Sequence, residues 1–309
     1  MKKEEFIEFL KKMNIEYDDE IMGCRYIFGI VRDCDSSIVN LQLNYGFKIE
    51  EVDMSDKFIT FLVAKGIIST FDWYNNHAGK IYLIIKKESC TKLESEYNKL
   101  SQGVDYFNYF ETIQMTLNLY FKCSVNIIKM FDIFISNGIY TSYSFKENLE
   151  YENKDDGVSI NDDIIEHIKN KLDFKIFKTE NLLPAFEFFK QSYTSKYLPM
   201  AFVGLISALE YLFLNTNTEL SYKLSRNVSV FLANTSEEFE TLFTQIKNYY
   251  DLRSTFLHSG KIKTSKVIID KKELNELREI VRRCLLKIIE KNDEFNKDKL
   301  IKELNRKGF

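Results

Sequence analysis

The first third of the chain alternates between apolar and polar positions in the manner of a β-sheet. Short runs of β-branched and aromatic residues are separated by clusters of Asp, Ser, Asn and Gly, a pattern typical of strands and turns. We predict strands at residues 25–32, 38–44, 47–52, 57–64 and 80–86. Residues 91–101 and 105–137 have a helical pattern, and residues 1–13 predict a short amphipathic helix at the start.

The second half of the chain is patterned as helices almost to its end. Residues 147–159 are acidic and poor in apolar side chains, which is typical of a linker. Beyond them we predict helices at residues 161–172, 180–194, 197–214, 219–233, 236–257 and 271–291. Thr235 with Glu238 has the spacing of a capping box before the fifth of these helices, and Asp270 with Glu273 offers a related polar pair before the sixth.

These patterns predict an α+β protein with two domains. Residues 1–150 are expected to form an N-terminal domain of sheet and helix, of no family that we recognise. Residues 160–309 are expected to form an all-α bundle, because short connections make neighbouring helices antiparallel. Only two prolines and 11 glycines interrupt the chain, which favours long helices.

Two charged residues fall on or beside apolar helix faces. Along residues 236–257 the apolar stripe contains Tyr250 and then, one turn later, Arg253 where an apolar side chain is expected. Glu210 lies beside the stripe of residues 197–214, a helix that is apolar nearly all round. Each charge is costly to bury alone, so we expect the two to form an ion pair across packed helices. The pair either serves packing only, or Glu210 orients Arg253 while part of the guanidinium faces a phosphate.

His258 follows Arg253 by five residues, near the end of the same predicted helix. Such a histidine is either a polar cap or a general acid, because the negative end of the helix dipole favours its protonated form. Five residues correspond to about 140° around a helix. The two side chains therefore reach one phosphate if the last turn loosens, which Ser259 and Gly260 allow.

Charge and composition refine the picture. The net charge of −3 does not indicate a nucleic-acid binder, but residues 245–291 hold twelve Lys and Arg against six Asp and Glu.

The five cysteines are scattered and form no C-x-x-C pair, which favours a reducing compartment. The first residues lack the apolar core of a secretory signal. Residues 197–214 are better explained as a buried helix than as a membrane span, so we expect a cytoplasmic protein without membrane contact.

Cofactor-dependent chemistry finds little support. The sequence holds no glycine loop that would bind phosphates and no His, Cys and Asp cluster at ligand spacing. His77 and His167 are isolated. We therefore expect neither a metal nor a cofactor.

Residues 200–291 resemble the HEPN superfamily, and within it the Apea-like HEPN domains. AFVGLISALEYLF resembles the family's apolar helix with a glutamate, and ELSYKLSRNVSVFLAN the helix that follows it. YYDLRSTFLHSGK matches the Arg-x4-His motif of the family, and ELREIVRRCLLKII resembles the closing helix. The resemblance covers only the C-terminal third of the chain.

The resemblance implies a helical domain that dimerises and brings two Arg/His pairs into one cleft. Many relatives are metal-independent endoribonucleases of toxin, abortive-infection or antiphage systems. Arg253 would stabilise charge on the scissile phosphate, and His258 would act as acid or base in the attack of the 2′-hydroxyl. Glu210 and Ser254 would orient that pair, and we include Asp251 among the supporting residues. Candidate residues for binding the flanking RNA are Arg226, Lys261 and Lys263.

These inferences predict an RNA-cleaving effector that acts as a homodimer on an RNA substrate. Residues 1–150 would bind a regulatory protein or a phage trigger, or restrain the nuclease. The alternative is a non-catalytic HEPN module for dimerisation or binding, which the negative net charge favours.

Overall fold

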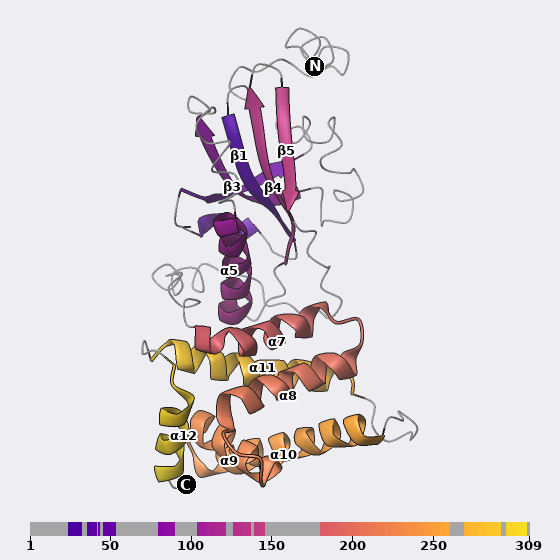
Figure 1. Cartoon of the computed structure of the whole chain (residues 1–309), viewed down its shortest axis with the longest axis vertical. Coiled ribbons are helices and arrows are strands. Elements are labelled where there is room, and N and C mark those ends of the chain that lie inside the picture. Colours follow the sequence, from indigo (N-terminus) through magenta and orange to yellow (C-terminus); the bar gives the residue numbers. More distant parts are fainter. Residues whose placement is uncertain are drawn as a thin grey trace. The chain divides into compact units, whose positions relative to one another are not determined.

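The computed structural model of the chain describes eleven stretches, in two compact units (Figure 1). The described residues are 24–32, 36–41, 43, 46–53, 80–89, 104–121, 126–136, 139–145, 180–259, 269–291 and 295–307. Those up to Phe145 belong to the first unit and those from Glu180 onward to the second. The boundary predicted near residue 150 lies outside the described residues, as do the predicted elements at 1–13, 57–64, 91–101 and 161–172.

The first unit is built on a five-stranded antiparallel sheet with the strand order β2-β3-β1-β4-β5. The strands are β1 (Cys24–Arg32), β2 (Lys48–Asp53), β3 (Lys80–Ser89), β4 (Asn126–Ser136) and β5 (Ile139–Phe145). The central strand β1 is buried on both faces, since Ile27, Phe28 and Ile30 are fully inaccessible to solvent. Together with the helical second unit, this sheet confirms the α+β class.

Helix α5 (Val104–Phe121) packs against this sheet. Its Phe110 contacts the ring of Phe47 edge to face at a centroid distance of 5.3 Å. Gly29 of β1 makes room for that contact, because a Cβ atom there would lie 2.8 Å from Ile127 and 3.4 Å from the Phe110 ring. The pairing of β1 with β4 is interrupted by a bulge, and there the Ile127 amide donates to Gln114 Oε1 of α5 at 2.9 Å.

Two predictions for this unit are wrong. Where a strand was expected at residues 38–44, a 3-10 helix, η1 (Ser36–Asn40), places Ile38 and Leu41 on one buried side, which suits its three-residue period. Of the helix expected at residues 105–137, residues 105–121 are helical, whereas residues 126–136 form β4. Strand β5 was not predicted.

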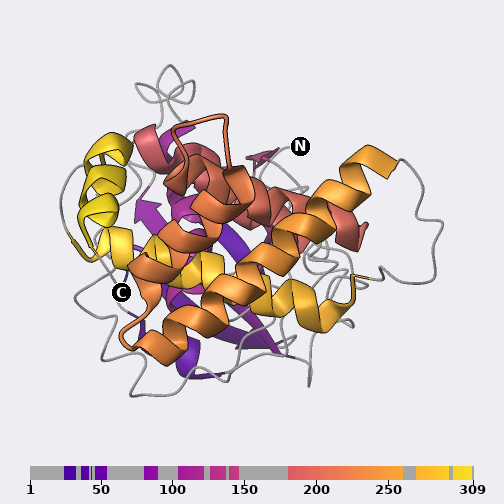
Figure 2. The ribbon, with the colours of Figure 1, turned by 90° about the horizontal axis from the view of Figure 1, so that it is seen from below.

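The second unit consists of helices. They are η5 (Glu180–Leu182), α7 (Leu183–Thr194), α8 (Leu198–Phe213), α9 (Leu220–Leu232), α10 (Ser236–Ser259), α11 (Lys271–Ile289) and α12 (Lys297–Arg306). The five helices predicted within residues 180–291 are confirmed to within a few residues, whereas α12 was not predicted. Figure 2 shows the long helix α10 running beside α9.

The core of this unit forms around α8, whose Phe202, Leu205, Leu209 and Phe213 are fully buried. The prediction of a buried core helix at residues 197–214 is thus confirmed. Of the helices that the structure describes, none combines the length and the apolar character needed to cross a membrane.

The first turns of α10 and α11 are held by the predicted caps. At α11, Asp270 Oδ1 accepts from the Glu273 amide at 2.8 Å and Glu273 Oε2 accepts from the Asp270 amide at 3.3 Å, a complete capping box. At α10, Thr235 Oγ1 accepts from the Glu238 amide at 3.1 Å, but the Glu238 side chain accepts from the Asn234 amide instead. The Thr235 cap helps to fix where α10, which carries the predicted site, begins.

Candidate functional site on helices α8 and α10

Arg253 of α10 and Glu210 of α8 form the expected ion pair. Arg253 Nη2 lies 3.2 Å from Glu210 Oε2, and each side chain is 21% exposed. The prediction that these two charges pair across packed helices is therefore confirmed. Because both side chains keep contact with solvent, the pair is accessible to a ligand.

The packing of α10 explains why Arg253 is held at this place. Tyr249, one turn earlier, packs its ring edge to face on Phe202 of α8 at 5.4 Å. Its hydroxyl donates to Glu276 Oε2 of α11 at 2.8 Å and accepts from Gln245 Nε2 at 2.9 Å. Burial raises the pKa of the Tyr249 phenol well above its usual range, so the group stays a neutral donor. These contacts fix α10 between α8 and α11 next to the ion pair.

Tyr250 is a further member of the site, which was not identified from the sequence. The carbon at the centre of the Arg253 guanidinium lies 5.7 Å from the centroid of the Tyr250 ring. Burial raises the pKa of the Tyr250 hydroxyl, and the negative charge of Glu210 raises it further. The tyrosine precedes Arg253 by three residues on the same apolar stripe, and this spacing is the sequence signal that could have revealed it.

The Arg253 guanidinium carries an N–H donor that has no acceptor among the described residues. Within the described part of the chain its only hydrogen bond is the one to Glu210. Its Nε is buried and has no acceptor there. A buried donor without an acceptor costs free energy, about 1–3 kcal/mol. Because Nε is closed to solvent, a ligand anion would meet only the exposed part of the Arg253 side chain.

His258 lies in the last turn of α10. The helix continues to Ser259, and the side chain of His258 is outside the described part of the structure. The backbone therefore remains helical over the whole Arg-x4-His segment. On such a helix the two residues lie about 140° apart around the axis and about 7.5 Å apart along it. The loosening on which convergence of the two side chains depends does not occur within residues 253–259.

The other predicted residues lie in different settings. Asp251 is exposed, and its carbonyl accepts from Thr255 Oγ1 at 2.9 Å. Ser254 is half-buried, and its hydroxyl has no hydrogen-bond partner within the described residues. Neither contacts Glu210 through a hydrogen bond described in the structure. Lys261 and Lys263 lie outside the described residues, and their predicted role stays a prediction.

Arg226 of α9 lies apart from Arg253 and binds the end of α12. Its Nη1 and Nη2 donate to the Leu304 carbonyl at 3.3 Å, and Nη2 also donates to the Lys307 carbonyl at 2.9 Å. Carbonyls at a helix end attract cations, so this arrangement stabilises α12. A contact with RNA phosphates stays a prediction for this residue.

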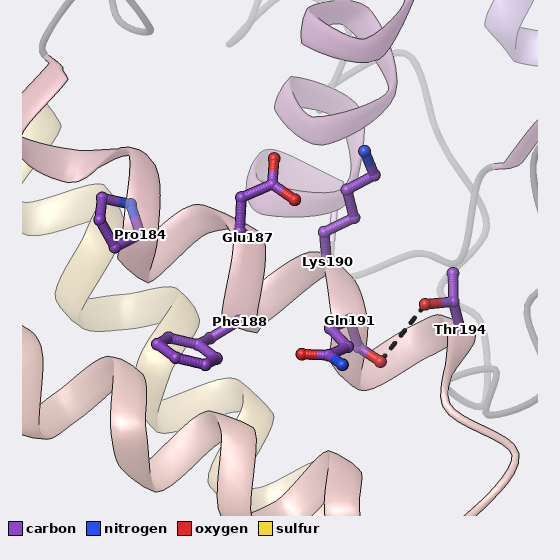
Figure 3. Close-up of a pocket in the computed structure, with 6 residues that line it drawn as sticks. All are labelled: Pro184, Glu187, Phe188, Lys190, Gln191 and Thr194. Atoms are coloured by element: carbon purple, nitrogen blue, oxygen red, sulfur yellow. Dashed lines mark hydrogen bonds between the residues drawn. The ribbon is translucent and has the colours of Figure 1, made fainter.

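The described residues hold no group of three or more His, Cys, Asp and Glu side chains that could bind a metal ion. A hollow of about 310 Å³ lies along α7, where Glu187 and Lys190 point to the same side (Figure 3). The described residues that line it are Pro184, Glu187, Phe188, Lys190, Gln191 and Thr194. None of them is a predicted site residue.

Comparison with known proteins gives no relative on which this site could be aligned. No protein-family model matches the chain, and neither a curated protein nor a solved structure matches it. The resemblance to HEPN domains therefore stays a prediction. It rests on four segments in order along the chain: the helix with Glu210, the helix with Arg226, the Arg-x4-His segment and the closing helix.

Proposed function

We propose that the helical unit is a metal-independent endoribonuclease of HEPN type. The observation that carries this proposal is the setting of Arg253. Glu210 holds one end of its guanidinium, Nε has no acceptor in the described residues, and the side chain is partly exposed. A guanidinium in this state is suited to stabilise the charge that develops on a phosphate. The histidine that catalysis requires follows five residues later in the last turn of the same helix.

In the proposed reaction the ribose 2′-oxygen attacks phosphorus and the 5′-oxygen leaves. A base takes the 2′ proton and an acid protonates the 5′-oxygen, so that the products end in a 2′,3′-cyclic phosphate and a 5′-hydroxyl. His258 acts as acid or base, since the negative end of the α10 dipole favours its charged form near neutral pH. Arg253 stabilises the phosphate during the attack, and Glu210 orients Arg253. Ser254 and Asp251 support this pair, and no metal or cofactor takes part.

A second copy of the chain completes the cleft in this proposal. One histidine cannot be acid and base at the same moment, whereas two copies supply two. Exposed apolar side chains beside the site support such an interface: Tyr197 and Met200 at the start of α8 are 43% and 50% exposed, and Leu257 of α10 is 45% exposed. The ring centroids of Tyr197 and Phe256 lie 6.2 Å apart, so the start of α8 lies beside the last turns of α10. Exposed apolar patches of this kind favour protein–protein contact.

The biological role proposed is that of an RNA-cleaving effector in toxin, abortive-infection or antiphage defence. It rests on the resemblance of the Arg-x4-His segment. Residues 1–150 would then bind a regulatory protein or a phage trigger that controls cleavage. A cytoplasmic site of action is supported by the buried, free thiol of Cys284.

A non-catalytic HEPN module for binding or dimerisation is the second candidate. One observation favours it: α10 stays helical through His258, which keeps Arg253 and His258 about 140° apart on one copy. The net charge of −3 also favours the non-catalytic module. This candidate predicts a stable dimer that cuts no RNA.

RNA cleavage by purified full-length chain in EDTA tests the proposal. We expect single-stranded or loop RNA to be cut, and Arg253→Ala and His258→Ala each to slow cutting roughly 100-fold or more. Arg306→Ala, the same change at an exposed position in α12, serves as the control and should leave the rate unchanged. Far-UV circular dichroism checks that all variants are folded. Equal cleavage by wild type and both site variants would refute the assignment.

A further inference from the structure

Two lysine ammonium groups share one aromatic ring where α9, α11 and α12 meet. Lys287 of α11 and Lys291, two residues past its end, each place Nζ 5.4 Å from the centroid of the Phe231 ring. Lys287 Nζ also donates to the Phe231 carbonyl in the last turn of α9 at 2.7 Å. The carbonyl end of a helix attracts cations, which explains the position of Lys287 but not that of the exposed Lys291.

A third lysine is brought to the same junction by α12. Arg226 of α9 binds the Leu304 and Lys307 carbonyls, so the end of α12 is tied to α9. Figure 1 shows α12 beside α9. The positive charge of Lys307 acts on Lys287 from there. We call Lys287, Lys291 and Lys307 the lysine cluster.

No carboxylate neutralises the lysine cluster within the described residues. Elsewhere in this unit Lys223 pairs with Glu219, and nearby Arg283 pairs with Glu238. Glu303 lines a small hollow of about 60 Å³ next to Lys291 but forms no ion pair with it. Burial lowers the pKa of Lys287, and the positive charges of Lys307 and Lys291 lower it further. Among the described residues, the junction thus concentrates positive charge that no carboxylate pairs with, in a chain whose net charge is −3.

We propose that the lysine cluster binds phosphates of single-stranded RNA at a place apart from Arg253. The choice of RNA as the ligand rests on the proposed function. Phosphodiesters are the anions that unpaired lysines bind through counterion release, and such binding needs no apolar contact. The large apolar side chains that are exposed among the described residues lie on α7, α8, α9 and α10, and none lies on α11 or α12. This composition favours a polyanion over a lipid surface, which would require an apolar face.

Salt-dependent binding of a labelled strand tests the proposal on the full chain. The probe is a fluorescein-labelled, 2′-O-methyl poly-uridine strand, which lacks the 2′-hydroxyl and cannot be cut by 2′-oxygen attack. Fluorescence anisotropy gives Kd at a series of salt concentrations. The test variant is Lys291→Gln with Lys307→Gln, which removes two exposed charges and leaves the Lys287 contact with α9 in place. The matched control, Lys48→Gln with Lys247→Gln, removes two exposed charges outside the cluster.

We expect the test variant to bind the strand roughly tenfold more weakly than wild type near physiological salt. The slope of log Kd against log salt should fall by about 1.4, because two phosphate contacts are lost and each contact on a single strand contributes about 0.7. The control should bind like wild type. Unchanged binding by the test variant, an equal loss in both double variants, or no binding by wild type would each overturn the proposal. If ordinary RNA is cut while the cluster variant binds and cuts like wild type, only this proposal fails. If the cluster binds the 2′-O-methyl strand but ordinary RNA stays intact, only the proposed function fails.

Discussion

Arg278 is the most deeply buried charged side chain among the described residues, with 1% of its surface exposed. Its guanidinium lies 4.1 Å from the centre of the Tyr193 ring. It donates to Ser192 Oγ at 2.9 Å, to the Ser192 carbonyl at 3.0 Å and to Asn275 Oδ1 at 2.8 Å. A single side chain thus connects α11 to the end of α7.

Replacing Arg278 should therefore destabilise the helical unit strongly. We expect Arg278→Ala to lower its free energy of unfolding by about 3–5 kcal/mol, because the buried partners lose their donors and a cavity opens. Arg306→Ala, in the exposed last turn of α12, should cost about 0.5 kcal/mol. Urea denaturation followed by circular dichroism measures both. A loss below about 1 kcal/mol for Arg278→Ala would contradict this account.

Glu238 links stability to pH. The Asn234 amide and, after it, the Arg283 guanidinium hold the pKa of its carboxylate below the ordinary value of 4.5. Since the pKa is lower in the folded state, the stabilisation is complete above about pH 4.5 and is lost as the pH falls below it. Glu238→Gln should lower stability at neutral pH and reduce the decline between pH 5 and pH 3. Glu237→Gln removes an equal charge from the same turn and should leave the decline unchanged; thermal unfolding across this pH range measures both variants.

At the residue scale, the sequence predicts a contact best where a charge interrupts an apolar pattern. Arg253 and Glu210 stand out in this way, and they pair in the structure. The contact of Arg226 could not be predicted. Its acceptors are carbonyls of residues 304 and 307, and nothing in the sequence indicates that α9 and α12 lie side by side.

Two glycines in regular elements are expected to respond oppositely to the same substitution. Gly204 lies inside α8, and a Cβ there would meet Phe188 at an ordinary 3.7 Å. Gly204→Ala should therefore stabilise the helix by about 0.5–1 kcal/mol. Gly29→Ala should destabilise the sheet by about 1–3 kcal/mol, because its Cβ would lie 2.8 Å from Ile127. Thermal unfolding measures both, and a stabilising Gly29→Ala would contradict the packing of α5 and β4 on β1.

Element by element, helices with one apolar face are predicted well, whereas a largely apolar run without a clear period can be assigned to the wrong type of element. Helix α11 has a clear apolar stripe and a capping box, so its start and end follow from the sequence. Seven of the eleven residues at 126–136 are apolar, and β4 lies inside the sheet between β1 and β5. Such a run fits a buried helix or a buried strand equally well. Only the pairing with β1, a hundred residues away in the chain, selects the strand.

For the whole molecule, the division into a sheet-containing first unit and a helical second unit could be inferred from the change of pattern along the chain. The lysine cluster could not, because its members come from the ends of two helices that meet only in the folded unit. The proposed role of Arg253 depends in addition on where a second copy and the RNA would lie. The proposal for the whole protein therefore depends on the chemistry at Arg253 and His258.

The dependence of cleavage on the 2′-hydroxyl in EDTA tests this chemistry most directly. Wild-type chain is incubated without divalent metals with a single-stranded RNA and with a DNA strand of the same sequence. We predict that the RNA is cut to products with 2′,3′-cyclic phosphate and 5′-hydroxyl ends and that the DNA stays intact. RNA that remains uncut, or DNA cut at the same rate, would contradict the account.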